Sequence, residues 1–187
     1  MDDITIQRVS SEEFWDGYKE EVQKEFSDFL HCRTSVLYSD VEKEKLSHLK
    51  PEFKEEGHIF LFAKKGSDIV GRSFSEQVSK NELLMCMSYV KSDYRNRGIY
   101  TKLLSETISV AKEIGYMKVS SSHNTSNNKI IIPKLKQGFV VSGMKINAGY
   151  GTLVELTLFL NETEKDMQDF RCGHRKPTEK IKNILSI

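Results

Sequence analysis

Cysteine is scarce in this sequence, and its arrangement argues against covalent cross-linking. The 187 residues include only three cysteines, Cys32, Cys86 and Cys172, and no C-x-x-C pair. An odd number of widely spaced cysteines does not form a disulfide framework, so we expect reduced thiols. Cys86 lies within an apolar run, which predicts a small buried side chain rather than a reactive one.

An excess of either charge is also missing. The 28 lysines and arginines nearly balance the 27 aspartates and glutamates, which gives a formal net charge of +1. This balance disfavours a dedicated nucleic-acid or membrane binder. The five histidines show no metal-ligand spacing, so we predict no metal site.

Long hydrophobic runs are absent as well. No stretch approaches the length needed to span a bilayer, and the acidic start Met1-Asp2-Asp3 lacks the apolar segment of a secretion signal. We therefore expect a cytoplasmic protein that binds neither membrane nor nucleic acid. A hydrophobic content of 38% is enough for the core of one domain over residues 1–187.

The first sixty residues predict one strand and two helices. Ile4 to Val9 alternates as a short strand does, and Ser10-x-x-Glu13 is a capping box for a following helix. A second capping signal, Ser39-x-x-Glu42, predicts a charged helix that stops near Pro51. The apolar positions of the first helix, which we expect mainly to pack in the core, are Phe14, Tyr18, Val22, Phe26, Phe29 and Leu30.

Strands dominate the pattern from Ile59 onward. Apolar runs over 59–63, 69–74 and 83–90, separated by turn residues, predict an antiparallel meander. A helix from about residue 100 to 114 ends at Gly115, and a strand over 117–121 must then run parallel to the third run.

Beyond that strand the sequence predicts a short helix, because Pro133 interrupts it. Its buried side chains are expected to be Ile130, Ile131, Leu135 and Phe139. Two further strands are predicted over 140–146 and 154–160, followed by a helical tail over 163–187.

The segment from Val90 to Gly115 carries the chemistry. A strand leads into the basic turn Arg95-Asn96-Arg97-Gly98 and then into an amphipathic helix. The first N–H groups of a helix lack partners and carry partial positive charge, so a phosphate or pyrophosphate fits there. An ordinary solvated loop would have the same residues. Neither the nucleoside-triphosphate loop G-x-x-x-x-G-K-[ST] nor the dinucleotide pattern G-x-G-x-x-G is present.

The pattern Arg95-x-x-Gly98-x-Tyr100 resembles the pyrophosphate-binding motif R/Q-x-x-G-x-G/A of the GCN5-related N-acetyltransferase (GNAT) superfamily, with Tyr100 in place of a small residue. That family commonly has an asparagine eleven residues before a Gly-Phe pair, as Asn127 stands before Gly138-Phe139. The resemblance covers about residues 59–160. It implies an α/β (α+β) fold with a mixed, mostly antiparallel six- to seven-stranded sheet, helices on both faces, and splayed fourth and fifth strands.

The function that the resemblance implies is acetyl transfer from acetyl-coenzyme A (acetyl-CoA) to a primary amine of a small molecule or peptide. Transfer would proceed by direct attack in a ternary complex, in a monomer or homodimer. The alternatives are a catalytically idle acyl-CoA-binding sensor or structural domain, and an RNA- or protein-interaction module. The implied cofactor-binding residues are Ser88, Tyr89 and Val90 at the end of the fourth strand, Arg95, Asn96, Arg97, Gly98, Ile99, Tyr100 and Thr101 in the pyrophosphate loop, and Asn127 at the pantetheine arm.

The groups that transfer protons are harder to assign. Many family members have a tyrosine seven residues after the asparagine as the acid for the leaving thiolate, and here that position is Lys134. We expect Lys134 to be a surface lysine with a pKa of about 10 and no catalytic part. His123, at the end of the fifth strand, has the pKa range of a general base and is the first candidate, ahead of Glu82 and Glu155.

Overall fold

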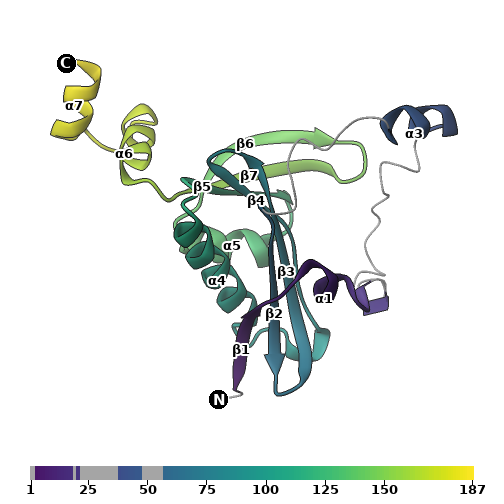
Figure 1. Cartoon of the computed structure of the whole chain (residues 1–187). Helices are drawn as coiled ribbons and strands as arrows, with labels where there is room; N and C mark the ends of the chain where they lie inside the picture. The colour runs from purple at the N-terminus through teal and green to yellow at the C-terminus, as the bar shows by residue number, and fades with distance from the viewer. Residues whose placement is uncertain (1–2, 19, 22–37, 48–56) are drawn as a thin grey trace.

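The computed structural model describes residues 3–18, 20–21, 38–47 and 57–187, and the elements below lie in these ranges. The strands are β1 (Ile4–Arg8), β2 (Ile59–Lys65), β3 (Asp68–Ser79), β4 (Glu82–Val90), β5 (Lys118–Asn124), β6 (Val140–Asn147) and β7 (Gly151–Phe159). The helices are α1 (Ser11–Trp15), α3 (Asp40–Ser47), α4 (Ile99–Ile114), α5 (Asn128–Lys136), α6 (Glu162–Arg171) and α7 (Glu179–Leu185), with a 3-10 turn at Ser92–Tyr94 (Figure 1).

The strands form one seven-stranded sheet in the order β1-β2-β3-β4-β5-β7-β6. Every neighbouring pair is antiparallel except β4 and β5, which are parallel and joined by α4. A crossover helix returns the chain to the end of the sheet where the preceding strand began, so the next strand runs parallel to it. The parallel pair therefore follows from the strand-helix-strand order. The predicted mixed, mostly antiparallel sheet is confirmed.

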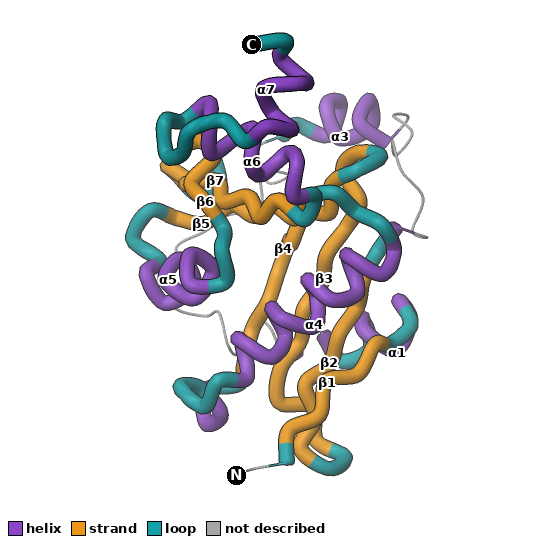
Figure 2. Tube along the Cα trace, turned by 90° about the vertical axis from the view of Figure 1, so that its left-hand side faces the viewer, coloured by secondary structure: helices purple, strands orange, loops and turns teal. Residues whose placement is uncertain are grey.

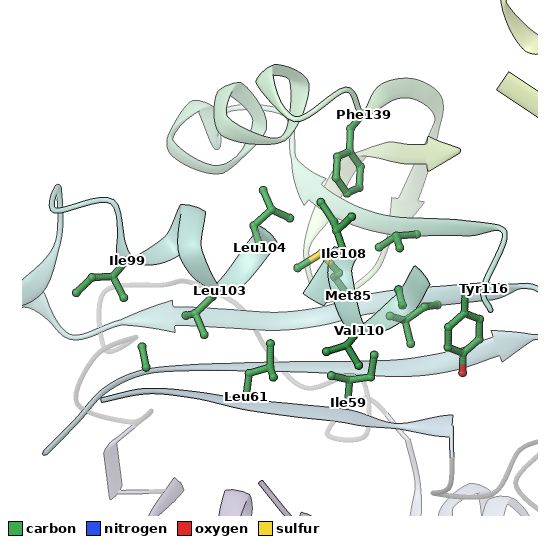
Figure 3. Packing of buried hydrophobic residues seen from close by; sticks show 14 of the residues in the cluster. Ile59, Leu61, Met85, Ile99, Leu103, Leu104, Ile108, Val110, Tyr116 and Phe139 are labelled. Atoms are coloured by element: carbon green, nitrogen blue, oxygen red, sulfur yellow. The ribbon is translucent and has the colours of Figure 1, made fainter. Parts of the chain in front are cut away.

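Helices cover both faces of the sheet, as predicted, and Figure 1 and Figure 2 together show α4 and α1 on opposite sides of β2 and β3. Leu103, Leu104 and Ala111 recur at helical spacing, so they form an apolar stripe on one face of α4. This stripe is buried. Figure 3 shows this stripe against Ile59 and Leu61 of β2 and Met85 of β4. The other face has a separate cluster of Phe14, Phe60 and Phe62, with Phe74 and Tyr18 packed against it.

Both predicted capping signals are present. The Ser10 hydroxyl accepts a hydrogen bond from the Glu13 amide at 3.1 Å, and the Ser39 amide donates to the Glu42 carboxylate at 2.8 Å. The predicted extent of the first helix is wrong, however. α1 ends at Trp15, because Asp16 has an extended backbone and Gly17 a left-handed one, with φ of +63°. Val22, Phe26, Phe29 and Leu30, and the predicted helix end near Pro51, lie outside the described residues.

α6 and α7 follow β7 and lie beyond its end, away from α4 (Figure 1). Each begins with a side-chain cap: Asn161 accepts from the Glu164 amide at 3.0 Å, and Thr178 accepts from the Ile181 amide at 3.3 Å. α7 packs on α6, and Ile181 is fully buried.

Candidate active site

The parallel strands β4 and β5 form a fork. The two strands pair only at Glu82–Lys118, Leu83–Val119 and Leu84–Ser120, and then separate. The cause is a β-bulge in β4: Phe74 of β3 pairs with Met87 and Ser75 with Met85, so Cys86 has no partner residue. A bulge bends the strand that holds it, and here the bend starts where the pairing with β5 stops. The predicted splay of these strands is confirmed.

The same bulge explains why the prediction for Cys86 is wrong. Cys86 is exposed rather than buried, because an unpaired bulge residue does not follow the alternation of the strand. Its thiol lies 3.5 Å from the Leu84 carbonyl oxygen.

The basic loop lies at the open end of the fork, between β4 and α4. Asn96 and Gly98 have left-handed backbones, with φ of +61° and +76°, and Gly98 is the N-cap of α4. No side chain caps this helix start, and its first turn has no acidic residue. The amides of Ile99, Tyr100 and Thr101 therefore point out of the helix start as donors for an anion. A Cβ at Gly98 would meet no described atom within 4 Å, so the space beside it is open.

The loop side chains hold the loop in shape and leave its outer side accessible. Arg95 donates from Nε to the Val90 carbonyl at 3.0 Å, which ties the loop back to the end of β4. The Arg97 guanidinium lies 5.5 Å from the centre of the Tyr94 ring. Tyr100, which replaces a small residue of the motif, packs against the α4 core cluster, so its ring does not occupy the anion site.

The end of β4 lies along the fork, where its backbone is paired with β3 but not with β5. Ser88, Tyr89 and Val90 pair with β3 through Ser73, Arg72 and Gly71, while β5 has already separated from them. β5 does not pair with these three residues, so any of their amides that point toward β5 face the fork. Such amides are suitable donors for a carbonyl or for an amide-containing arm.

Asn127 and His123 lie on the opposite side of the fork from β4. Asn127 is the N-cap residue of α5, yet its side chain makes no capping bond and no other hydrogen bond within the described chain, so its amide group is available to a ligand. His123 is half-buried on β5, with Nε2 3.1 Å from the Ser121 hydroxyl.

The expected pKa of His123 is wrong. Burial, and then the charge of nearby Lys134, lowers the pKa of His123 to about 4. The imidazole is therefore neutral across the physiological range and is a weaker base than the sequence implied.

The expectation of a surface lysine at position 134 is also wrong. Lys134 is 1% exposed, while Leu135, predicted to be buried, is 43% exposed. The helix is rotated from the predicted orientation, so Lys134 points into the interior, where its Nζ lies 3.2 Å from Met85 Sδ and 4.8 Å from the centre of the Phe139 ring. Burial lowers the pKa of Lys134 to about 7.

A buried polar cluster that sequence reasoning missed supports the end of β4 from the other face. Arg72 is 2% exposed and donates to Glu21 at 3.0 Å, to the Asp16 carbonyl at 3.1 Å and to the Phe14 carbonyl. Glu21 also accepts from the Tyr89 hydroxyl and lies 3.5 Å from the Lys91 ammonium. The one available signal was an arginine within the apolar strand Ile69–Phe74.

The charge state of this cluster follows from its contacts. Burial alone would raise the pKa of Glu21, but hydrogen bonds from Tyr89 and Arg72 and the charges of Arg72 and Lys91 outweigh it, so the pKa is lowered. Glu21 is therefore an ionised anchor for Arg72 and Tyr89 rather than a proton acceptor.

Glu82 and Glu155, the other carboxylates considered as bases, are engaged elsewhere. Glu82 accepts from the Ser120 hydroxyl at 2.6 Å and lies 3.4 Å from Lys118, while Glu155 lies 3.1 Å from Lys145. Across the described ranges, no three His, Cys, Asp or Glu side chains group closely enough to hold a metal ion. None of the described helices is both long and apolar enough to cross a membrane.

The uncapped start of α4 lies at the open end of the fork, and the end of β4 runs along the fork. The Acetyltransferase (GNAT) family matches residues 15–139, which is more than half of the chain. The protein therefore belongs to the GNAT acetyltransferase family, whose acyl donor is acetyl-CoA. Comparison of the sequence with curated proteins finds no significant match.

Solved structures share the fold at low sequence identity. The ribosomal-protein-S18-alanine N-acetyltransferase from Escherichia coli is 16% identical over 84% of this chain and 94% of its own, with a TM-score of 0.62. A GNAT family acetyltransferase from Elizabethkingia anophelis, solved with acetyl-CoA bound, is 17% identical over 86% and 100%, with a TM-score of 0.59. YncA from Salmonella typhimurium, solved with its cofactor acetyl-CoA, is 16% identical over 85% and 95%, with a TM-score of 0.63.

Proposed function

We propose that the protein transfers the acetyl group of acetyl-CoA to a primary amine of a small molecule or peptide, by direct attack in a ternary complex. The observation that carries this proposal is the fork, which opens beside an uncapped helix start. The two features match the two ends of the donor: a pyrophosphate needs clustered N–H donors, and a pantetheine arm needs a slot with free backbone groups. In the same proposal the protein acts in the cytoplasm, as a monomer or homodimer.

The chain supplies each binding function from a separate segment. The loop from Arg95 to Thr101 would hold the pyrophosphate, largely through backbone amides. Asn127 would bind the pantetheine arm through its free side-chain amide, and Ser88, Tyr89 and Val90 would donate to the arm and the thioester carbonyl. The Arg72 cluster keeps these strand-end residues in place from behind, because Glu21 binds both Arg72 and the Tyr89 hydroxyl.

Turnover on a panel of amines tests the proposal. Purified protein is incubated with acetyl-CoA and single amines, including diamines, amino acids and short peptides with free N-termini, and the released thiol is measured. Thiol release that depends on one amine class, with the acetylated product confirmed by mass, is expected. Tight coenzyme A binding with no turnover on any amine would instead identify an idle acyl-CoA-binding domain.

Substitution of Gly98 is expected to weaken coenzyme A binding through the backbone. Gly98→Val adds a branched side chain at a left-handed φ and fills the open space beside the helix start, so the affinity should fall by about 1 kcal/mol or more. Arg97→Ala should cost less, because it removes one exposed, partly screened charge. Calorimetric titration with coenzyme A measures both.

Gly66→Val is the matched control for this experiment. Gly66 also has a left-handed backbone, with φ of +60° and no neighbour within 4 Å of a Cβ, but it lies in the β2–β3 turn. The Gly66→Val variant has the same backbone strain but lies outside the loop from Arg95 to Thr101. Its affinity for coenzyme A should therefore equal that of the wild type. Equal affinities for Gly98→Val and the control would place the phosphates elsewhere.

His123 stays the predicted general base, with a smaller expected contribution. Since its pKa is lowered to about 4, His123→Ala should reduce kcat/KM by about tenfold, below the usual range for general catalysis. The low-pH limb of the wild-type profile should lie near pH 4 and disappear in the variant. His174→Ala, on an exposed side chain after α6, should leave the profile unchanged. A wild-type limb near pH 6.5 that His123→Ala leaves in place would contradict the assignment.

A further inference from the structure

Lys134 is a buried amine without a compensating anion. Its side chain is 1% exposed, and among the described residues the polar and ring partners of its Nζ are the Met85 sulfur and the Phe139 ring. No carboxylate among the described residues forms an ion pair with it. Burying a lysine in this way costs stability, since a thioether is a weak acceptor and a ring face replaces only part of the lost hydration. Packing alone therefore does not account for a lysine here.

The position of the amine places it at the closed end of the fork. Leu84–Ser120 is the last pair between β4 and β5, and Met85, which Nζ contacts, is the next residue of β4. His123 lies on β5, three residues beyond Ser120, and its titration is affected by the charge of Lys134. The amine thus lies where the two strands part, with Met85 on one side and the His123 strand on the other.

The orientation of the donor follows from the proposed function, on which this inference rests. With the pyrophosphate at the open end of the fork, beside Gly98, the arm must run inward along β4. The thioester is the far end of that arm, so its sulfur is the part that points toward the closed end, where Lys134 lies.

We propose that the Lys134 ammonium is the acid that protonates the departing thiolate. The acceptor nitrogen, as a neutral amine, attacks the thioester carbonyl carbon, and the carbon–sulfur bond breaks with its electron pair on sulfur. Lys134 gives one proton from Nζ to the sulfur, which leaves as the thiol. The acceptor nitrogen loses one proton to His123 or water as the amide forms. That proton returns to Nζ through solvent, so the lysine is unchanged over one cycle.

The pKa values of the side chains near the closed end of the fork fit this role. An ammonium with a pKa of about 7 transfers a proton readily to a thiolate, because a thiol is the weaker acid: the ordinary pKa of a cysteine thiol is about 8.5. His123 cannot take this part, because its imidazole is already neutral at pH 7. Cys86 and Tyr89 on β4 have raised pKa values and stay protonated as well. Of these four side chains, Lys134 is thus the one that changes charge near neutrality.

Two substitutions of Lys134 test the inference. Lys134→Met keeps the volume and removes the proton, and Lys134→Arg keeps a cation that does not release its proton. Both should lower kcat by about 10²-fold and leave the affinity for acetyl-CoA, measured by calorimetry, within about twofold. In the wild type, kcat should fall as the pH rises through about 7, because the Lys134 ammonium loses its proton. This high-pH limb of the kcat profile should be absent in Lys134→Met. Lys136→Met, two residues on and exposed, should behave as wild type.

The outcomes separate this inference from the proposed function. If the wild type transfers acetyl groups and Lys134→Met keeps both its kcat and its limb near pH 7, Lys134 is not the acid and the proposed function stands. Full activity of Lys134→Arg with loss in Lys134→Met would assign the lysine an electrostatic role and overturn the proton transfer. If the wild type transfers no acetyl group to any amine, the proposed function fails and this inference fails with it.

Discussion

Arg72→Ala is expected to lower the free energy of unfolding by about 3–5 kcal/mol, the cost typical of breaking a buried ion pair by removing one partner. The guanidinium is 2% exposed and donates to the Glu21 carboxylate and to the carbonyls of Phe14 and Asp16. It also lies 4.6 Å from the centre of the Phe62 ring. Alanine would leave a cavity, two carbonyls without donors and a carboxylate without its main partner.

Urea unfolding at pH 7 measures this loss. Arg8→Ala is the matched control, because Arg8 is an exposed arginine on the neighbouring strand β1 and should change stability by less than about 0.5 kcal/mol. The double variant Arg72→Met with Glu21→Gln should lose less than the sum of its single variants, since both charged partners are removed together. A loss below about 1 kcal/mol in Arg72→Ala would show that the network contributes little.

Arg72→Ala should also affect the cofactor-binding end of β4. Glu21 accepts from both Arg72 and the Tyr89 hydroxyl, so Arg72 helps to fix the end of β4 that faces the fork. We therefore expect the remaining folded Arg72→Ala protein to bind acetyl-CoA more weakly, although Arg72 itself lies on the opposite face of the sheet from α4.

The parts of the fold that the sequence predicted correctly depend on local signals. The apolar stripe of α4, its glycine C-cap at Gly115 and the turn between the first two runs of the meander are set by residues close together in the chain. The parallel pair then follows from chain connectivity. The position of the loop from Arg95 to Thr101, between a strand and a helix, could be predicted for the same reason.

The incorrect predictions depend on contacts between distant segments. The bulge that exposes Cys86 arises from the register between β3 and β4, which no local pattern in β4 records. Lys134 is buried and Leu135 exposed because α5 docks over Met85 and Phe139, and this docking overrides the apolar pattern of a short helix. The break after Trp15 did have a local signal, Gly17, which the strong aromatic periodicity outweighed in the sequence interpretation.

The candidate site divides in the same way. The backbone donors proposed for the cofactor, at the end of β4 and in the loop, were implied by a family resemblance that rests on a short contiguous motif. For the side chains proposed to transfer protons, His123 and Lys134, the sequence did not predict the pKa values, because burial sets them. His123 and Lys134 both have pKa values far from those of the free side chains, and in each case burial is the main cause.

Burial of Lys134 should also make the stability of the protein rise with pH. Its pKa is about 7 in the folded protein against an ordinary value of 10.5, so between these values the unfolded chain binds a proton that the folded protein does not. Stability increases with pH wherever the unfolded state binds more protons, and below pH 7 both states are protonated and the fold bears the full cost of the buried charge. For this one group, the gain from pH 6 to pH 9 is about 2–3 kcal/mol.

Comparison with Lys134→Met separates the pH-dependent stability that Lys134 causes from that caused by other titrating groups. Methionine fills a similar volume without a charge, so at pH 6 the variant should be more stable than the wild type by on the order of 2–4 kcal/mol. The difference should shrink by about 2–3 kcal/mol at pH 9, where the wild-type amine is neutral in the fold. Urea unfolding of both proteins at the two pH values gives the comparison, with the exposed Lys136→Met as control. A difference that stays constant between pH 6 and pH 9 would mean that Lys134 does not titrate near neutrality, and it would remove the physical basis for its role as the acid.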